Sequence, residues 1–113
     1  MKTFNELKSM TSVMNRLYDI AHQYTTGIFS DTSWENVHNV FNQFSKLFSD
    51  FSWWVEDGGY SIDGKSKEYK GKFTVKTNYF TKVVNFKLTA YAAGTIENLW
   101  EKYDMSIMFY LEK

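Results

Sequence analysis

The residues best spaced for chemistry are the eight from Gly59 to Ser66, GYSIDGKS. They match the pattern G-x-x-x-x-G-K-[ST], in which loop amides, a lysine and a hydroxyl hold nucleotide phosphates and Mg²⁺. That chemistry requires a helix directly after the loop, because the helix N-terminus binds the phosphates. Here only KEYKG separates Ser66 from a clear strand, which leaves no room for a helix. We therefore predict a hairpin loop, and we expect no nucleotide or other cofactor.

Metal and thiol chemistry has few candidate ligands. The sequence holds two histidines, His22 and His38, and no cysteine. Both histidines are expected on helices beside an apolar stripe, where they could approach one another. A zinc site needs three or four ligands at suitable spacing, so no metal site is predicted. The absence of cysteine excludes a disulfide framework, and a reducing cytoplasm is the simplest setting.

Acid–base catalysis would have to come from a buried carboxylate. The candidates are Asp19, Asp50, Glu56 and Asp57. Two helices over a curved sheet can enclose an apolar pocket, as cone-like α+β folds do, and a carboxylate buried there would have a raised pKa and could act as a base. Nothing in the sequence selects one of the four, and Asp57 beside two glycines is more simply a turn residue. A small-molecule pocket protein or enzyme is therefore an alternative without an assigned catalytic residue.

A lysine-rich segment follows the loop. Between residues 64 and 93 only Glu68 opposes seven lysines: Lys65, Lys67, Lys70, Lys72, Lys76, Lys82 and Lys87. On one face they could hold phosphates while Tyr69, Tyr79 or Tyr91 stack on bases, so nucleic-acid binding is a second alternative. Two facts oppose it: arginine, the usual residue for bidentate phosphate and base recognition, occurs once, and the formal net charge is zero.

The distribution of charge and aromatic residues favours a protein partner. Residues 1–63 carry four basic and eight acidic side chains, a net charge of −4, whereas residues 64–113 carry nine and five, a net charge of +4. Aromatic residues make up 19% of the chain, and Trp and Tyr are common at interface hot spots. The predicted partner-binding residues are Lys70, Lys72, Lys76, Lys87, Trp53, Trp54 and Trp100. Self-association is left open.

The elements that must position these residues are clearest between Gly71 and Gly94. Apolar and polar residues alternate through Lys72–Tyr79 and again through Val84–Tyr91, which is typical of strands with one buried face. The connection at Tyr79–Lys82 is too short for a crossover helix, so the two strands should be antiparallel neighbours. The face that carries Lys72, Lys76 and Lys87 should be wet, and the other needs a cover.

Two amphipathic helices near the N-terminus supply that cover. Thr3 with Glu6, and Thr32 with Glu35, fit capping boxes, with Asp31 as an alternative cap for the second helix. Each box is followed by apolar residues at three- and four-residue steps, and Gly27 is a natural stop for the first helix. The linker between the two predicted helices is only about seven residues long, which is typical of neighbouring antiparallel helices.

The remaining segments complete the sheet. We predict a short strand over residues 51–56, a possible return at Tyr60–Ile62, a short helical or irregular connection over 95–104, and a final strand that pairs with Val83–Tyr91. The chain of 113 residues is thus predicted to be a single α+β domain, with two N-terminal helices packed on one face of a four- or five-stranded antiparallel sheet. No apolar run is long enough to span a bilayer and no signal peptide is recognised, so we expect no membrane partner and a cytoplasmic location.

The functional expectation follows from these patterns together. Lysine outnumbers arginine twelve to one and proline is absent, a bias that AT-rich coding would produce and that is common in phage and mobile-element genes. We therefore expect a non-enzymatic protein-binding module, such as a small inhibitor of a host enzyme or defence complex.

Overall fold

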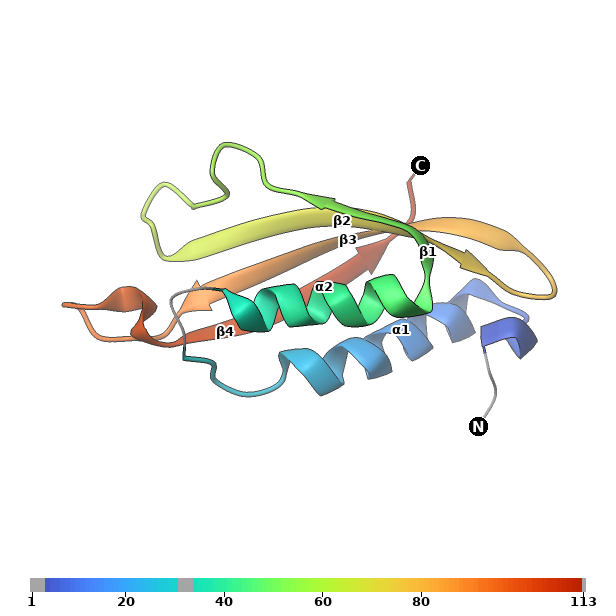
Figure 1. Ribbon diagram of the computed structural model, residues 1–113, viewed down its shortest axis with the longest axis horizontal. Coiled ribbons are helices and arrows are strands. Elements are labelled where there is room, and N and C mark those ends of the chain that lie inside the picture. The colour runs from blue at the N-terminus through green and yellow to red at the C-terminus, as the bar shows by residue number, and fades with distance from the viewer. Residues whose placement is uncertain (1–3, 31–33, 113) are drawn as a thin grey trace.

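Two helices lie on one face of an antiparallel sheet. The computed structural model describes residues 4–30 and 34–112. Its elements are a 3-10 turn η1 (Phe4–Glu6), helices α1 (Met10–Thr25) and α2 (Glu35–Leu47), strands β1 (Ser49–Trp54), β2 (Ser66–Lys76) and β3 (Thr81–Ala92), a 3-10 turn η2 (Leu99–Glu101), and strand β4 (Tyr103–Tyr110). The strands lie in the order β1-β2-β3-β4, each antiparallel to its neighbour. The predicted α+β architecture is confirmed, and the described residues form four strands (Figure 1).

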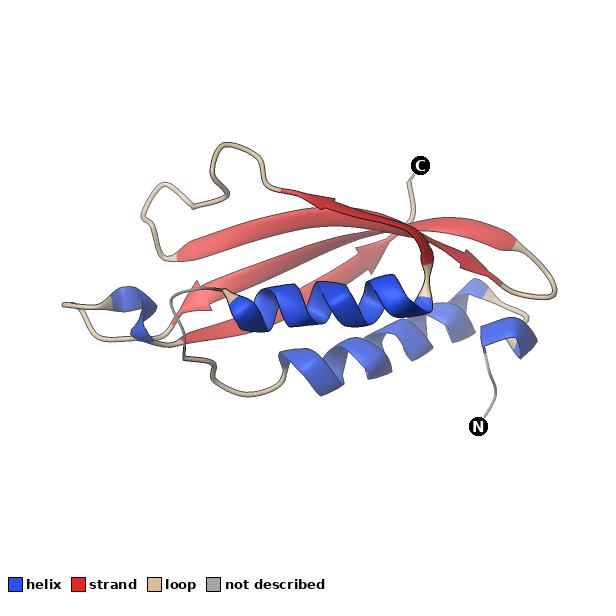
Figure 2. Ribbon diagram, in the orientation of Figure 1, coloured by secondary structure: helices blue, strands red, loops and turns tan. Residues whose placement is uncertain are grey.

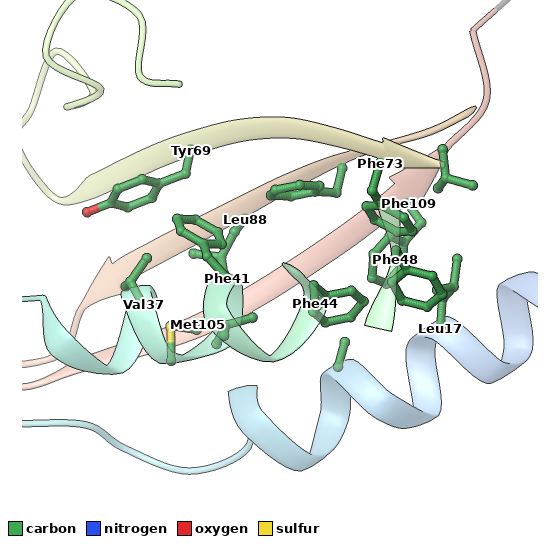
Figure 3. Packing of buried hydrophobic residues seen from close by; sticks show 14 of the residues in the cluster. Leu17, Val37, Phe41, Phe44, Phe48, Tyr69, Phe73, Leu88, Met105 and Phe109 are labelled. Atoms are coloured by element: carbon green, nitrogen blue, oxygen red, sulfur yellow. The ribbon is translucent and has the colours of Figure 1, made fainter. Parts of the chain in front are cut away.

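The core lies between the helices and the sheet. The alternation predicted for the central strands places Phe73, Val75, Phe86 and Leu88 on the covered face, where all four are buried. The apolar stripes of α1 and α2, including Leu17, meet them from the other side (Figure 3). Aromatic residues make up eight of the 18 buried hydrophobic residues in the described chain, so part of its high aromatic content is used in this layer.

The central hairpin differs from its prediction in its limits. Strand β2 begins at Ser66 and ends at Lys76, so Ser66, which the sequence places in the hairpin loop, and the KEYKG segment after it already belong to the sheet. The turn lies at residues 77–80 and is closed by Thr77, whose amide and hydroxyl both bond to the carbonyl of Phe80. Tyr79, which the alternation places among the buried residues, is therefore exposed in this turn. Strict alternation ends where the strand ends.

The helix starts also differ. Residues 4–6 form only the turn η1, and α1 begins at Met10 after Ser9, whose hydroxyl accepts a hydrogen bond from the Ser12 amide. The second helix, α2, begins after Trp34, which has left-handed backbone angles. Thr3, Asp31 and Thr32, which the two capping predictions require, lie outside the described residues.

The connections place small extra contacts on the sheet. Tyr60 forms only a single bridge with Lys67, so the predicted return strand at Tyr60–Ile62 is absent from the described chain. Phe29, between the two helices, forms a similar antiparallel bridge with Tyr103. The predicted irregular connection over 95–104 contains the turn η2, and the final strand pairs with β3 as predicted.

Candidate protein-binding face

The sheet face opposite the helices is not covered by any described helix (Figure 2). We call it the open face. Cross-strand partners share a face, so the register defines its rows. One row runs Trp54–Lys70–Lys87–Met108, and a second runs Ser52–Lys72–Asn85–Tyr110. The open face therefore brings together four of the predicted residues, Lys70, Lys72, Lys87 and Trp54.

The lysines of the open face differ in their pairing. The Lys70 ammonium lies 3.1 Å from Oε2 of Glu56 and 3.8 Å from Oε1 of Glu68, and Lys87 lies 3.9 Å from Glu68. The hydrogen bond and charge of Lys70 lower the pKa of Glu56, and Glu56 in turn raises the pKa of Lys70. Lys72 is exposed and forms no ion pair with a described residue. Its charge is thus available to a partner.

Apolar side chains are interspersed with these charges. Trp54, Met108 and Tyr110 are exposed by 39%, 46% and 40%. Their cross-strand partners are Lys70, Lys87 and Asn85, respectively. Val83 and Tyr91 on β3 are similarly exposed. The open face thus mixes exposed aromatic and aliphatic groups with lysines.

An amide in the middle of the open face has an unused donor. Asn85 is only 5% exposed, and its Nδ2 finds no hydrogen-bond partner within the described part of the chain. Its cross-strand neighbours are Lys72 and Tyr110. A buried donor without an acceptor is costly, and it is rare in folded proteins.

The other predicted site residues lie elsewhere. Trp53 alternates with Trp54 and therefore points to the helix side, where its ring packs 5.0 Å from Phe41 and 5.5 Å from His38. Trp100 donates its indole N–H to the carbonyl of Gly64 and packs 5.1 Å from Trp34 at one end of the sheet. Neither lies among the lysines of the open face. Lys76 shares the parity of Lys72 but stands at the last residue of β2, beside the turn.

Lys67 is also separate from the basic rows. It points to the helix side, where its ammonium lies over the rings of Trp34, Tyr60 and Tyr69, 4.9, 5.0 and 5.2 Å from their centroids. Burial lowers its pKa. Tyr69 is itself buried in the core, so of the three tyrosines considered for base stacking only Tyr91 lies on the open face. This aromatic enclosure of Lys67 could not be seen in the sequence, because its rings come from three separate segments.

The phosphate-loop motif forms a tight turn. As predicted, no helix follows the loop; Ser66 instead begins strand β2. The carboxylate of Asp63 accepts hydrogen bonds from the Ser61 hydroxyl at 2.6 Å and the Lys65 amide at 3.0 Å, which lower its pKa. The Lys65 amide, which a bound phosphate would need as a donor, is therefore already bonded to the Asp63 carboxylate. The first glycine of the motif, Gly59, is required by the backbone rather than by a phosphate. Its φ is +82°, and a Cβ there would lie 2.9 Å from the Glu68 carbonyl oxygen.

The remaining candidates for chemistry are dispersed. His38 lies beside β1 and His22 beside β4, at opposite sides of the sheet. The described residues contain no group of three side chains able to hold a metal ion. The four carboxylates considered as bases are all exposed: Asp19, Asp50, Glu56 and Asp57. None of them is therefore enclosed in an apolar pocket of the kind that the catalytic alternative requires.

Comparisons with other proteins leave the site to be interpreted from its own geometry. In the described chain, no helix is both long and apolar enough to cross a membrane. No family model, curated protein or solved structure matches the chain.

Proposed function

We propose that this chain is a non-enzymatic protein-binding module whose open face is the contact surface. The observation that carries the proposal is the placement of Lys72, Lys70 and Lys87 beside Trp54, Met108 and Tyr110 on a sheet face that no described helix covers. Aromatic and methionine side chains supply apolar contact area, while the lysines around them supply charge.

The partner that fits this face has an acidic surface with apolar groups at its centre. Opposite charges would accelerate encounter and set orientation, and burial of the aromatic groups would slow dissociation. The lysine-rich, cysteine-free composition agrees with a protein encoded by a phage or mobile element and acting in the cytoplasm. In that setting the chain would be a small inhibitor of a host enzyme or defence complex.

The unpaired amide of Asn85 adds a polar contact to this proposal. A carboxylate or carbonyl of the partner would accept from Nδ2 once Lys72 and Tyr110, its cross-strand neighbours, adjust. The free protein then tolerates an unsatisfied donor that the complex satisfies.

The proposal is tested by reversing charges that have no structural task. Lys72→Glu with Lys76→Glu changes two lysines without a described ion pair, so the fold should survive. The partner is first isolated from the native host, and its Kd is then measured by calorimetry. We expect the double variant to bind about tenfold more weakly or worse, because like charges then face each other.

The matched control makes the same change of charge elsewhere. Lys8→Glu with Lys46→Glu alters exposed lysines before α1 and at the end of α2, in the helical layer on the other side of the sheet. This control should retain the affinity of the unchanged protein. Equal losses in the two double variants would show that overall charge, not the open face, controls binding.

The exposure of Trp54 beside Lys70, with Tyr91 and Tyr110 exposed on the same face, also favours a second candidate, single-stranded nucleic acid. Aromatic side chains stack on bases of any sequence while lysines bind phosphates. A labelled single-stranded oligonucleotide separates the two candidates. Affinity for it that falls steeply with salt, and is lost in the Lys72→Glu and Lys76→Glu variant, would replace the protein partner by nucleic acid.

Asn85→Leu separates stability from binding. The side chains are similar in size, and leucine removes the unpaired donor, so the free energy of unfolding should stay the same or rise by up to about 1 kcal/mol. Affinity for the partner should fall several-fold, because the acceptor on the partner loses its donor. Urea unfolding followed by circular dichroism gives the first quantity, and calorimetry gives the second. A clear loss of stability would mean that Nδ2 is already satisfied in the free protein.

A further inference from the structure

The outer edge of β4 has its backbone groups satisfied at two places only, within the described chain. At one end, Tyr103 and Phe29 exchange two hydrogen bonds of 2.9 Å, as neighbouring strands do. At the other end, the hydroxyl of Tyr18 accepts from the Phe109 amide at 3.0 Å and lies 3.4 Å from the Phe109 carbonyl oxygen. Tyr18 thus substitutes for a strand at that position.

Between these two ends lies an unpaired stretch of backbone. In an antiparallel ladder every second residue directs its N–H and C=O to the same neighbour. The backbone N–H and C=O groups of Tyr103 and Phe109 point away from β3. The backbone N–H and C=O groups of Met105 and Ile107 must therefore point away from β3 as well. The residue before Tyr103 has the opposite orientation, as this alternation requires: the carbonyl of Lys102 accepts from the Ala93 amide on the β3 side. Among the residues that the structure describes, nothing bonds to the outward groups of Met105 and Ile107.

The unpaired stretch opens into a groove. A depression of about 420 Å³ lies between the last turns of α1 and β4, lined by Ala21, His22 and Thr25 on one side and by Met105 and Ile107 on the other. The groove therefore places two backbone donors and two acceptors beside the apolar side chains of Ala21, Met105 and Ile107. This combination is what an added β-strand uses: main-chain bonds provide affinity and alternate side chains provide specificity.

A second copy of the chain fits this edge poorly. Two β4 strands paired about Ser106 would bring each Phe109 opposite the other chain's Tyr103. Those positions are already bonded to Tyr18 and Phe29, and both molecules carry α1 beside the edge. A peptide segment can leave the edge at either end, whereas a second folded sheet cannot.

We propose that this β4 edge binds a short extended peptide segment of a partner protein, antiparallel to β4, as the Phe29 bridge already is. Peptide residues opposite Met105 and Ile107 point into the groove and should be apolar. The residue between them, opposite Ser106, points to the other face and should be polar. The residue that follows the one opposite Met105 faces Asp104, which is exposed, and should be basic. The site is independent of the open-face proposal.

The probe is the capped peptide Gly-Ser-Val-Thr-Val-Lys-Gly-Ser, whose two valines fall opposite Ile107 and Met105. In the free protein, amide exchange measured by NMR should be faster at Met105 and Ile107 than at Ser106, Met108 and Phe109. Addition of millimolar peptide should shift the Met105 and Ile107 signals and slow their exchange. N-methylation of both valines should weaken binding about tenfold or more, because two hydrogen bonds are lost. N-methylation of the threonine, whose N–H points away from β4, is the matched control and should leave binding unchanged.

The outcomes distinguish a peptide held at the β4 edge from a peptide held elsewhere on the protein. Replacing the peptide lysine by glutamate should weaken binding, whereas the Lys72→Glu and Lys76→Glu variant of the protein should bind the probe normally. The proposal is overturned if the probe does not bind, if all N-methylated forms bind equally, or if the shifts fall on the open face. Concentration-dependent dimerisation with protection of Met105 and Ile107, detected by ultracentrifugation, would assign the edge to a second copy instead.

Discussion

Phe73→Ala should reduce the free energy of unfolding by about 3–5 kcal/mol, a large part of the stability of a domain of this size. Phe73 is fully buried at the centre of the sheet. Five aromatic rings lie within 6.3 Å of its own ring, measured between centroids: Phe44, Phe48, Phe51, Phe86 and Phe109. Removing the ring leaves a cavity whose walls come from α2 and three other strands, and these cannot all move inward together. Urea unfolding followed by tryptophan fluorescence measures the loss.

Tyr79→Ala is the control for this prediction. It also removes an aromatic ring, but from the exposed turn between β2 and β3, where the Lys8 ammonium lies 5.5 Å from the ring centroid. Its effect should stay below about 1 kcal/mol. Similar losses in the two variants would contradict a core centred on Phe73.

Gly71→Ala should destabilise the protein by at least about 2 kcal/mol, although it adds a single methyl group. Gly71 lies in β2 opposite Trp53 of β1 and Phe86 of β3. An added Cβ would overlap the Phe86 ring and lie 2.5 Å from the carbonyl oxygen of Ser52. The ring is held by the core and the carbonyl belongs to the β1 backbone, so β1 must move away. We expect altered tryptophan fluorescence, because Trp53 and Trp54 are on β1.

A second substitution identifies the cause of this loss. Phe86→Leu shortens the side chain that the new methyl group meets, so the double variant should lose less stability than the sum of the two single variants. Lys72→Ala, at the next residue but on the open face, should change stability by less than about 0.5 kcal/mol. Additive losses in the double variant would show that the ring is not the obstacle.

The sequence predicts the layers of this fold well because both signals are periodic. Alternation through β2 and β3 identifies the covered face, and helical spacing identifies the faces of α1 and α2 that cover it. Ends are harder, since they depend on local bonds. The Ser9 hydroxyl caps α1, although the sequence offers a hydroxyl at Thr3 as well. Thr77 bonds to Phe80 and starts the turn, so the alternation does not continue to Tyr79.

The candidate site is predictable only in part, because it depends on the register between strands. Alternation alone places Lys72 and Lys87 on the wet face and separates Trp53 from Trp54. It also places Met108 and Tyr110 on one face of β4, but only the pairing of β4 with β3 brings them beside Lys87 and Asn85. Trp100 has no such periodic signal, since its position follows from the hydrogen bond to Gly64.

The two margins of the sheet have a consequence for self-assembly. The margin at β1 carries Asp50 with φ of +56° and a break in register between Ser49 and Ser52, which bends the strand away from any flat neighbour. The margin at β4 is obstructed by Phe29 and Tyr18. Neither margin therefore presents an uninterrupted template for stacking into fibrils. For an aromatic-rich chain with a formal net charge of zero, we expect the shape of these margins, more than net charge, to limit edge-to-edge stacking.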